Sequence, residues 1–152
     1  MSLYELLLFA HVLAAAAWFG AALLSLLLLE LATRARETGW VVRFGEFDDH
    51  LAKLLFIPAA LVVLASGVAL VLDGHWTFRE DGWATVGLVL FAVIFVLGVA
   101  LIVPAGARLT ALAREGAAEE RIHAQLGRLR MLSWIDVALL AIVIFLMTTK
   151  PF

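Results

Sequence analysis

The chain has 152 residues, of which 64% are hydrophobic, a formal net charge of -2 and no cysteine. Soluble domains are close to half apolar, so this composition indicates that lipid covers much of the surface. The charge favours no nucleic-acid partner. The lack of cysteine excludes disulfides, thiolate metal sites, iron–sulfur clusters and c-type haem attachment. The length predicts one domain, residues 1–152.

Four apolar segments are long enough to cross a bilayer, which takes about 20 residues for roughly 30 Å of hydrocarbon. They are residues 6–29, 54–72, 83–107 and 131–149. No basic residue precedes the first of them, which is therefore expected to be a span and not a signal peptide. Lipid offers no partner to open backbone groups, and the apolar runs are continuous instead of alternating. The sequence therefore predicts an all-α integral membrane four-helix bundle.

The two connections between spans one and two and between spans three and four are themselves expected to be helical. Apolar residues recur every three or four positions over residues 40–54 and again over residues 122–132. Asp49 and Lys53 form an acid-before-base pair at i,i+4, which supports an exposed helix face. The spans and connections together predict two long helical hairpins in parallel orientation.

Basic residues predict how the chain is oriented. They gather in the first and third connections and are sparse elsewhere: Arg34, Arg36, Arg43 and Lys53; then Arg108, Arg114, Arg121, Arg128 and Arg130; but only Arg79 between spans two and three and Lys150 at the end. Loops rich in arginine and lysine stay in the cytoplasm. Both termini and the segment 73–82 are therefore expected outside.

His11 is the histidine that falls inside a predicted span. An ionisable side chain in a span is a functional hypothesis by default, and a neutral imidazole could ligate haem iron or a metal. The plainer interpretation is a histidine hydrogen-bonded to a neighbouring helix. Residues 14–17 are alanines and residue 20 is glycine, so a helix or a flat cofactor could approach closely.

Asp136 is a second ionisable residue within a predicted span, the fourth, where burying a carboxylate in the membrane costs free energy. Its depth is expected to differ from that of His11 by roughly 15 Å, so the two should not pair. Lys53, Arg108 or Arg130 are the expected partners near the inner face. One interpretation is an ion pair that holds the helices together, and the other is a proton-handling carboxylate.

The remaining histidines lie outside the predicted spans. His75 is expected in the outer segment, where it could share a cofactor site with His11. His50 and His123 are expected on the inner side and could share a second site. Each is also compatible with an ordinary surface position, and no short-range metal-binding signature such as H-x-x-x-H occurs.

Several short motifs resemble an uncharacterised family of predicted four-helix bacterial integral membrane proteins. They are His11 with Trp18-Phe19-Gly20, Lys53 with Pro58 and Gly67, and the terminal Lys150-Pro151-Phe152. That family is similar in turn to the copper-resistance D membrane domain and to the four-helix bacterial protoporphyrinogen oxidase, a haem-binding enzyme thought to pass electrons to quinone. The resemblance implies a multi-pass protein of the bacterial cytoplasmic (inner) membrane, with His11 at the haem-associated position and Lys53 at a basic one.

The oxidase pattern is incomplete in this chain. Its third-helix histidine has no counterpart in residues 83–107, and Ser133-Trp134-Ile135-Asp136 stands where an Asn-Glu-x-Pro motif would open the fourth helix. Three functions therefore stay open. The first is a redox-linked protein binding haem b through His11, with His75 as a second ligand. The second is a permease for a small solute or metal ion. The third is a non-catalytic partner of a membrane complex, or a homo-oligomer.

Overall fold

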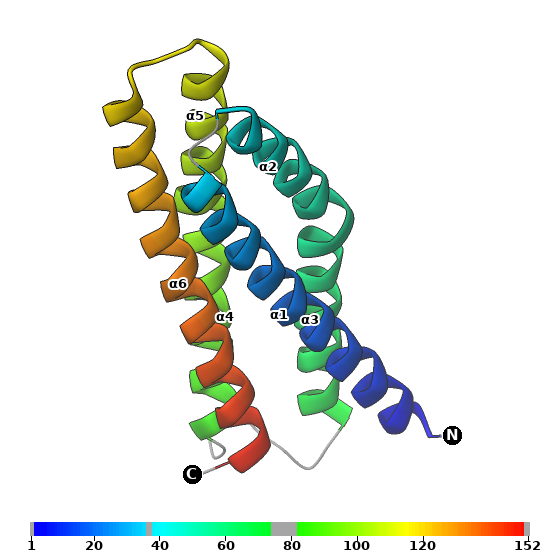
Figure 1. Cartoon of the computed structure of the whole chain (residues 1–152). Coiled ribbons are helices and arrows are strands. Elements are labelled where there is room, and N and C mark those ends of the chain that lie inside the picture. Colours follow the sequence, from blue (N-terminus) through cyan, green and yellow to red (C-terminus); the bar gives the residue numbers. More distant parts are fainter. Residues whose placement is uncertain (1, 36–37, 74–81, 151–152) are drawn as a thin grey trace.

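The computed structural model describes residues 2–35, 38–73 and 82–150, and nearly all of these residues are helical. The predicted all-α class is confirmed. Four long helical stretches follow one another along the chain (Figure 1). They are α1 (Leu3–Ala35); α2 (Thr38–Leu51), η1 (Ala52–Phe56) and α3 (Ile57–Asp73) in one run; α4 (Gly82–Leu97), η2 (Gly98–Ile102) and α5 (Val103–Arg114) in another; and α6 (Glu119–Thr149).

Each helical stretch is longer than the predicted span that it contains. The spans counted over Leu3–Ala35, Gly39–Asp73, Gly82–Arg114 and Glu119–Thr149 have 33, 35, 33 and 31 residues and are apolar enough to cross a membrane. At 1.5 Å per residue, each is about 45–55 Å long, against roughly 30 Å of hydrocarbon. The surplus includes α2, α5 and the start of α6, so the expected helical connections are confirmed.

The two ends of the bundle contain different helix ends and connections. At one end, called the connection end here, α1 is followed by α2, and α5 by α6. At the other, the terminal end, α3 ends, α4 begins and both chain termini lie (Figure 1). The termini thus share one end of the bundle, as a four-span chain requires. That this end faces outward stays a prediction from the basic residues.

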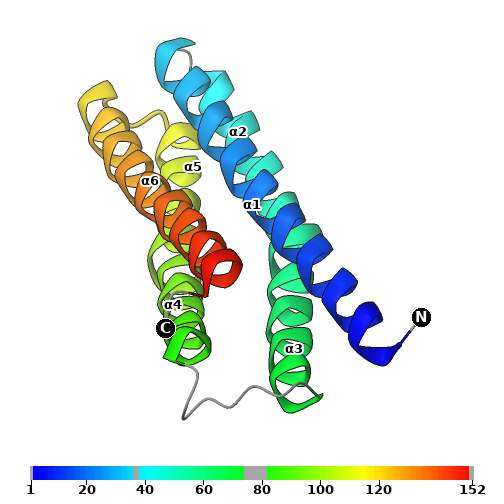
Figure 2. The same cartoon turned by 90° about the horizontal axis from the view of Figure 1, so that it is seen from below.

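Helix packing changes between the two ends. At the connection end α2 packs on α5, α1 on α2, and α5 on α6. At the terminal end α1 packs on α3 and α4 on α6, but α3 and α4 diverge. Both views show this separation of α3 from α4 (Figures 1 and 2). The bundle is therefore closed at one end and divided into two helix pairs at the other.

Both central stretches contain a π-helical segment that ends two residues before a proline. The N–H of Ile57 donates to the carbonyl of Ala52, and the N–H of Val103 to that of Gly98, each five residues back. Pro58 and Pro104 follow immediately and have no N–H to donate. A π-helical turn is one way in which a helix accommodates such a break. At these prolines the helix changes register without ending, and the change at Pro58 coincides with the bend between α2 and α3 in Figure 1.

The largest buried cluster lies toward the connection end. It includes Leu29, Leu109 and Leu129, each only 1% exposed, from α1, α5 and α6. A second cluster around Leu26 and Ile94 fills the middle of the bundle. Many large apolar side chains point outward instead, which is the arrangement expected of a surface solvated by lipid.

Candidate functional site

His11 projects from α1 toward α3, where its ring is held by one hydroxyl. The ring Nδ1 lies 3.0 Å from Oγ of Ser66, a buried residue of α3. Ser66 uses its single hydroxyl proton to donate to the backbone carbonyl of Val62. Its oxygen must therefore accept from His11, so Nδ1 carries the imidazole proton. In a neutral ring, Nε2 is then left as the acceptor.

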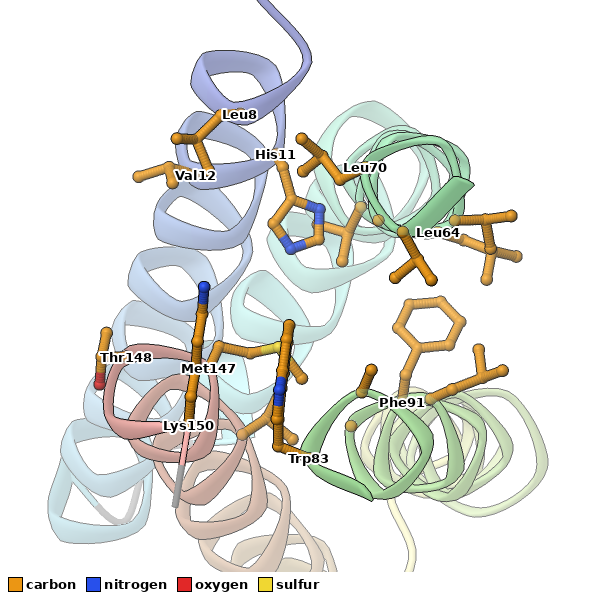
Figure 3. Close-up of a pocket in the computed structure, with 18 of the residues that line it drawn as sticks. Leu8, His11, Val12, Leu64, Leu70, Trp83, Phe91, Met147, Thr148 and Lys150 are labelled. Carbon is orange, nitrogen blue, oxygen red and sulfur yellow. The ribbon is translucent and has the colours of Figure 1, made fainter. Parts of the chain in front are cut away.

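Nε2 of His11 faces a cavity of about 250 Å³ at the terminal end. This space, called the terminal cavity here, lies between the two helix pairs and receives side chains from α1, α3, α4 and α6. Figure 3 shows the second ring nitrogen of His11 pointing into it, with Trp83 and Phe91 entering from α4. The lining is mostly aliphatic and aromatic. A polar acceptor in such surroundings is suited to fixing the orientation of a ligand, and Tyr4, Thr148 and Lys150 add further polar groups to the lining.

Two glycines make room for side chains beside the terminal cavity. A Cβ on Gly67 would lie 3.0 Å from Cε1 of His11, so the imidazole occupies space that a larger residue in α3 would take. A Cβ on Gly87 would collide with the terminal methyl of Met147, which reaches from α6 to α4. Gly67 and Gly87 are therefore close-contact positions, whereas no side-chain or distant backbone atom lies within 4 Å of a Cβ built on Gly98, for which the sequence suggested the same role.

The end of α6 contributes a cation to the terminal cavity. Lys150 follows the last helical turn in the left-handed conformation, with φ of 44°. Its Nζ lies 5.0 Å from the ring centroid of Trp83, within the range of a cation–π contact. Both residues line the cavity. The end of α6 is thereby joined to the start of α4.

Lys53 and Asp136 are not brought together. Lys53 donates to Asp49 at 2.6 Å, the i,i+4 pair expected from the sequence, on the exposed face of the helix. Arg130, another expected partner of Asp136, lies 3.5 Å from Glu30. Asp136 is half-buried and has no ion pair in the part of the chain that the structure describes. The predicted pairing is therefore wrong, because nearer carboxylates already engage Lys53 and Arg130.

Several polar contacts that join helices could not be predicted from the sequence. Ser25 of α1 donates to Asp48 of α2 at 2.5 Å, and Glu30 accepts from Nε1 of Trp134 at 3.2 Å as well as pairing with Arg130. The contact of Ser66 with His11 is another. Each hydroxyl is an isolated polar residue in an apolar run, which is a weak signal. Its partner lies 23 or 55 residues away.

The other histidines do not assemble a metal site where they are described. His50 donates from Nδ1 to the carbonyl of Glu46 at 2.8 Å, and His123 is exposed. Within residues 2–35, 38–73 and 82–150, no three His, Cys, Asp or Glu residues form a group able to hold a metal ion. His75, the expected second cofactor ligand, lies outside the described residues.

Comparison with known proteins identifies the family and no closer relative. No curated protein and no solved structure matches the chain. The expected similarity to the copper-resistance D domain and to protoporphyrinogen oxidase is therefore without support. One family model, described as "Predicted integral membrane protein (DUF2269)", matches residues 5–151. The chain accordingly belongs to this family of integral membrane proteins.

Proposed function

We propose that the terminal cavity binds a small, mostly apolar molecule that donates a hydrogen bond to Nε2 of His11. One observation carries the proposal: the Ser66 contact holds the proton on Nδ1, so an acceptor nitrogen faces an apolar space. No buried side-chain nitrogen or oxygen among the described residues lacks a partner, so Nε2 is reached from the cavity and does not carry the cost of a fully buried acceptor. A ligand hydroxyl would donate to Nε2, while the apolar body of the ligand would occupy the space between the helix pairs.

The shape and chemistry of the cavity favour a single substituted ring with a hydroxyl group. Its volume of about 250 Å³ lies just below the roughly 300–1,000 Å³ of pockets for drug-sized ligands. Trp83 and Phe91 offer aromatic surface to a flat ring. Because α3 and α4 diverge at this end, a molecule dissolved in lipid is the natural candidate. Phenols and quinols have this combination of properties.

Trimethylhydroquinone and its dimethyl ether provide a matched pair of probes, because only the first donates a hydrogen bond. Binding would be measured anaerobically by isothermal titration calorimetry on detergent-solubilised protein, with empty micelles as the blank. We expect the quinol to bind roughly three- to tenfold more tightly, the usual worth of one hydrogen bond. His11→Leu should remove that difference, whereas His50→Leu, which alters an exposed histidine, should preserve it. Equal binding of both probes to the unmodified protein would refute the proposal.

Haem b is a second candidate, favoured by the same hydrogen bond. Metal-ligating histidines usually donate their other ring N–H to a fixed oxygen, as His11 does to Ser66. His11 could supply one axial ligand to the haem iron. The cavity is small for haem, because a porphyrin is larger than most drug-sized ligands and the cavity volume is already below the range of pockets that bind such ligands.

Absorbance of protein purified from haem-replete cells separates the two candidates. A Soret band that disappears in His11→Ala, with unchanged helical circular dichroism, would support haem. A colourless protein that hemin does not reconstitute would remove haem and leave the quinol proposal to its own experiment.

We further propose that the protein resides in the cytoplasmic membrane of a bacterium. Multi-pass integration in a bilayer is supported by the family and by the four long apolar helices. The permease and complex-partner functions stay predictions. A solute crossing the bundle would have to displace the buried cluster around Leu26 and Ile94, which packs the middle of the molecule.

A further inference from the structure

The connection end carries an apolar groove that is separate from the terminal cavity. It is formed where α1 and α2 lie side by side, and has a volume of about 670 Å³. It is called the arginine groove here. Its lining consists of Leu28, Leu31, Arg34, Ala35, Trp40, Arg43, Phe44 and Phe47. No carboxylate is among these residues.

Arg34 and Arg43 give the groove its charge. One comes from the last turn of α1 and the other from α2. Both are exposed, and neither has an ion pair with any carboxylate that the structure describes. By contrast, Arg114 and Arg130 pair with Glu46 and Glu30 at this same end. Two unpaired guanidinium groups beside one groove favour an anionic ligand, and arginine suits phosphate in particular.

The apolar part of the groove continues from these arginines toward the membrane. Leu28 lies six residues before Arg34 in α1, which corresponds to about 9 Å along the helix axis. Leu31, Trp40 and Phe47 remain 59%, 49% and 41% exposed. An acyl chain could therefore lie against these side chains while a phosphate lies at the level of the arginines. Tryptophan is also common at the boundary between lipid and water.

We propose that the arginine groove binds an anionic phospholipid, with the phosphate between Arg34 and Arg43 and an acyl chain along Leu28, Leu31 and Phe47. The two positively charged arginines favour an anionic lipid over a zwitterionic one. The apolar side chains that line the rest of the groove favour a lipid over free phosphate. Basic residues just beyond a span at the cytoplasmic side are a recognised basis for anionic-lipid binding.

Quenching of Trp40 fluorescence tests the proposal. Phosphatidylglycerol with brominated acyl chains would be titrated into the full chain in detergent, and the signal of Trp40 obtained by subtracting a Trp40→Phe protein. We expect saturable quenching by brominated phosphatidylglycerol, weaker quenching by brominated phosphatidylcholine, and no displacement by inorganic phosphate at equal concentration. Equal quenching by the two lipids, or displacement by phosphate alone, would overturn the proposal.

Matched arginine variants test whether Arg34 and Arg43 bind the lipid phosphate. Arg34→Gln with Arg43→Gln should weaken phosphatidylglycerol binding roughly thirtyfold, since each basic residue near a membrane surface contributes a roughly fivefold factor. Arg34→Lys with Arg43→Lys should keep much of it. Arg121→Gln with Arg128→Gln, two exposed arginines of α6 outside the groove, should have no effect. If both pairs of glutamine substitutions weakened lipid binding equally, the attraction would be nonspecific and the proposed site would be contradicted.

A second copy or a soluble protein is the alternative occupant. In that case, cross-linking of the Phe47→Cys protein would give a dimer or a protein adduct, and added phosphatidylglycerol would not lower its yield. We expect the lipid to protect that cysteine from a thiol reagent instead. A lack of protection would overturn the lipid assignment.

Discussion

The terminal half of the bundle is the more apolar, because most charged residues lie in the connection half, yet the connection half is the more closely packed. In the connection half, α1, α2, α5 and α6 surround one large buried cluster. In the terminal half, the corresponding cluster has three buried members among the described residues, Trp83, Ala84 and Leu146, and a cavity separates the helix pairs. Hydrophobicity alone therefore does not close a membrane bundle, because lipid is as apolar as leucine and shape must supply the attraction.

The π-helical segments η1 and η2 lie where this change in packing begins. Each joins a helix that packs centrally, α2 or α5, to one that diverges, α3 or α4. Pro58 and Pro104 impose the loss of a backbone donor at these points. The divergence leaves the space into which His11 projects. The two candidate binding regions thus arise differently, one from helices that separate and the other from the outer surface of helices that pack.

The largest expected effect is on the signal of topology reporters, because each end of the bundle lies entirely on one side of the membrane or the other. Reporter fusions at Gly39 and Gly116, in the connection half, should read cytoplasmic. Fusions after Asp73 and after Lys150, in the terminal half, should read external, since the basic residues gather in the connection half. A reversed pattern would contradict the orientation, and an odd number of crossings would contradict the four-span bundle.

Truncation of a buried leucine should distinguish the stability of the two halves. Leu129→Ala, in the large cluster, should lower the free energy of unfolding in sodium dodecyl sulfate titrations by about 2–5 kcal/mol. Leu146→Ala, beside the terminal cavity, should cost roughly half as much, because neighbouring side chains can relax there.

Leu72→Ala is the matched control for both leucine substitutions. Its side chain is 77% exposed, so the change should stay within about 0.5 kcal/mol. Equal losses for Leu129→Ala and Leu146→Ala would show that the two halves are packed equally well.

Adding one carbon at Gly67 should disturb the terminal half alone. Gly67→Ala places a Cβ 3.0 Å from Cε1 of His11, so the ring must shift and its contact with Ser66 is disturbed, at a cost of about 1 kcal/mol or more. Trimethylhydroquinone binding should weaken with it. Gly20→Ala is the control, because no side-chain or distant backbone atom lies within 4 Å of its Cβ, and should be neutral or stabilising. Chemical shifts of the His11 ring that are identical in both variants would argue against the contact.

The smallest effect is expected at Asp136. Asp136→Asn removes a carboxylate that has no ion pair among the described residues, so stability should change by no more than about 0.5 kcal/mol. Glu30→Gln should cost more, about 0.5–1 kcal/mol, since Glu30 contacts both Arg130 and Trp134. A larger loss for Asp136→Asn would reveal a partner beyond the described residues.

Features that depend on neighbours along the chain could be predicted from the sequence. Each of the four apolar runs falls within a long helix, and the helical connections and the Asp49–Lys53 pair follow from periodicity and i,i+4 spacing. The importance of His11 could be anticipated as well, because an ionisable group in an apolar run is conspicuous whatever surrounds it.

Contacts between distant segments required the tertiary structure. The sequence predicted that Asp136 lies at a similar depth in the membrane to several basic residues. Only the tertiary structure shows that Arg130 pairs with Glu30 instead of Asp136. Likewise, Ser66 meets His11 across 55 residues, and this contact decides which ring nitrogen faces the cavity. The physical reason is that hydropathy sets which residues enter the membrane and local spacing sets the helices. The rotation and divergence of those helices depend on shape, on two prolines and on glycines that let side chains approach.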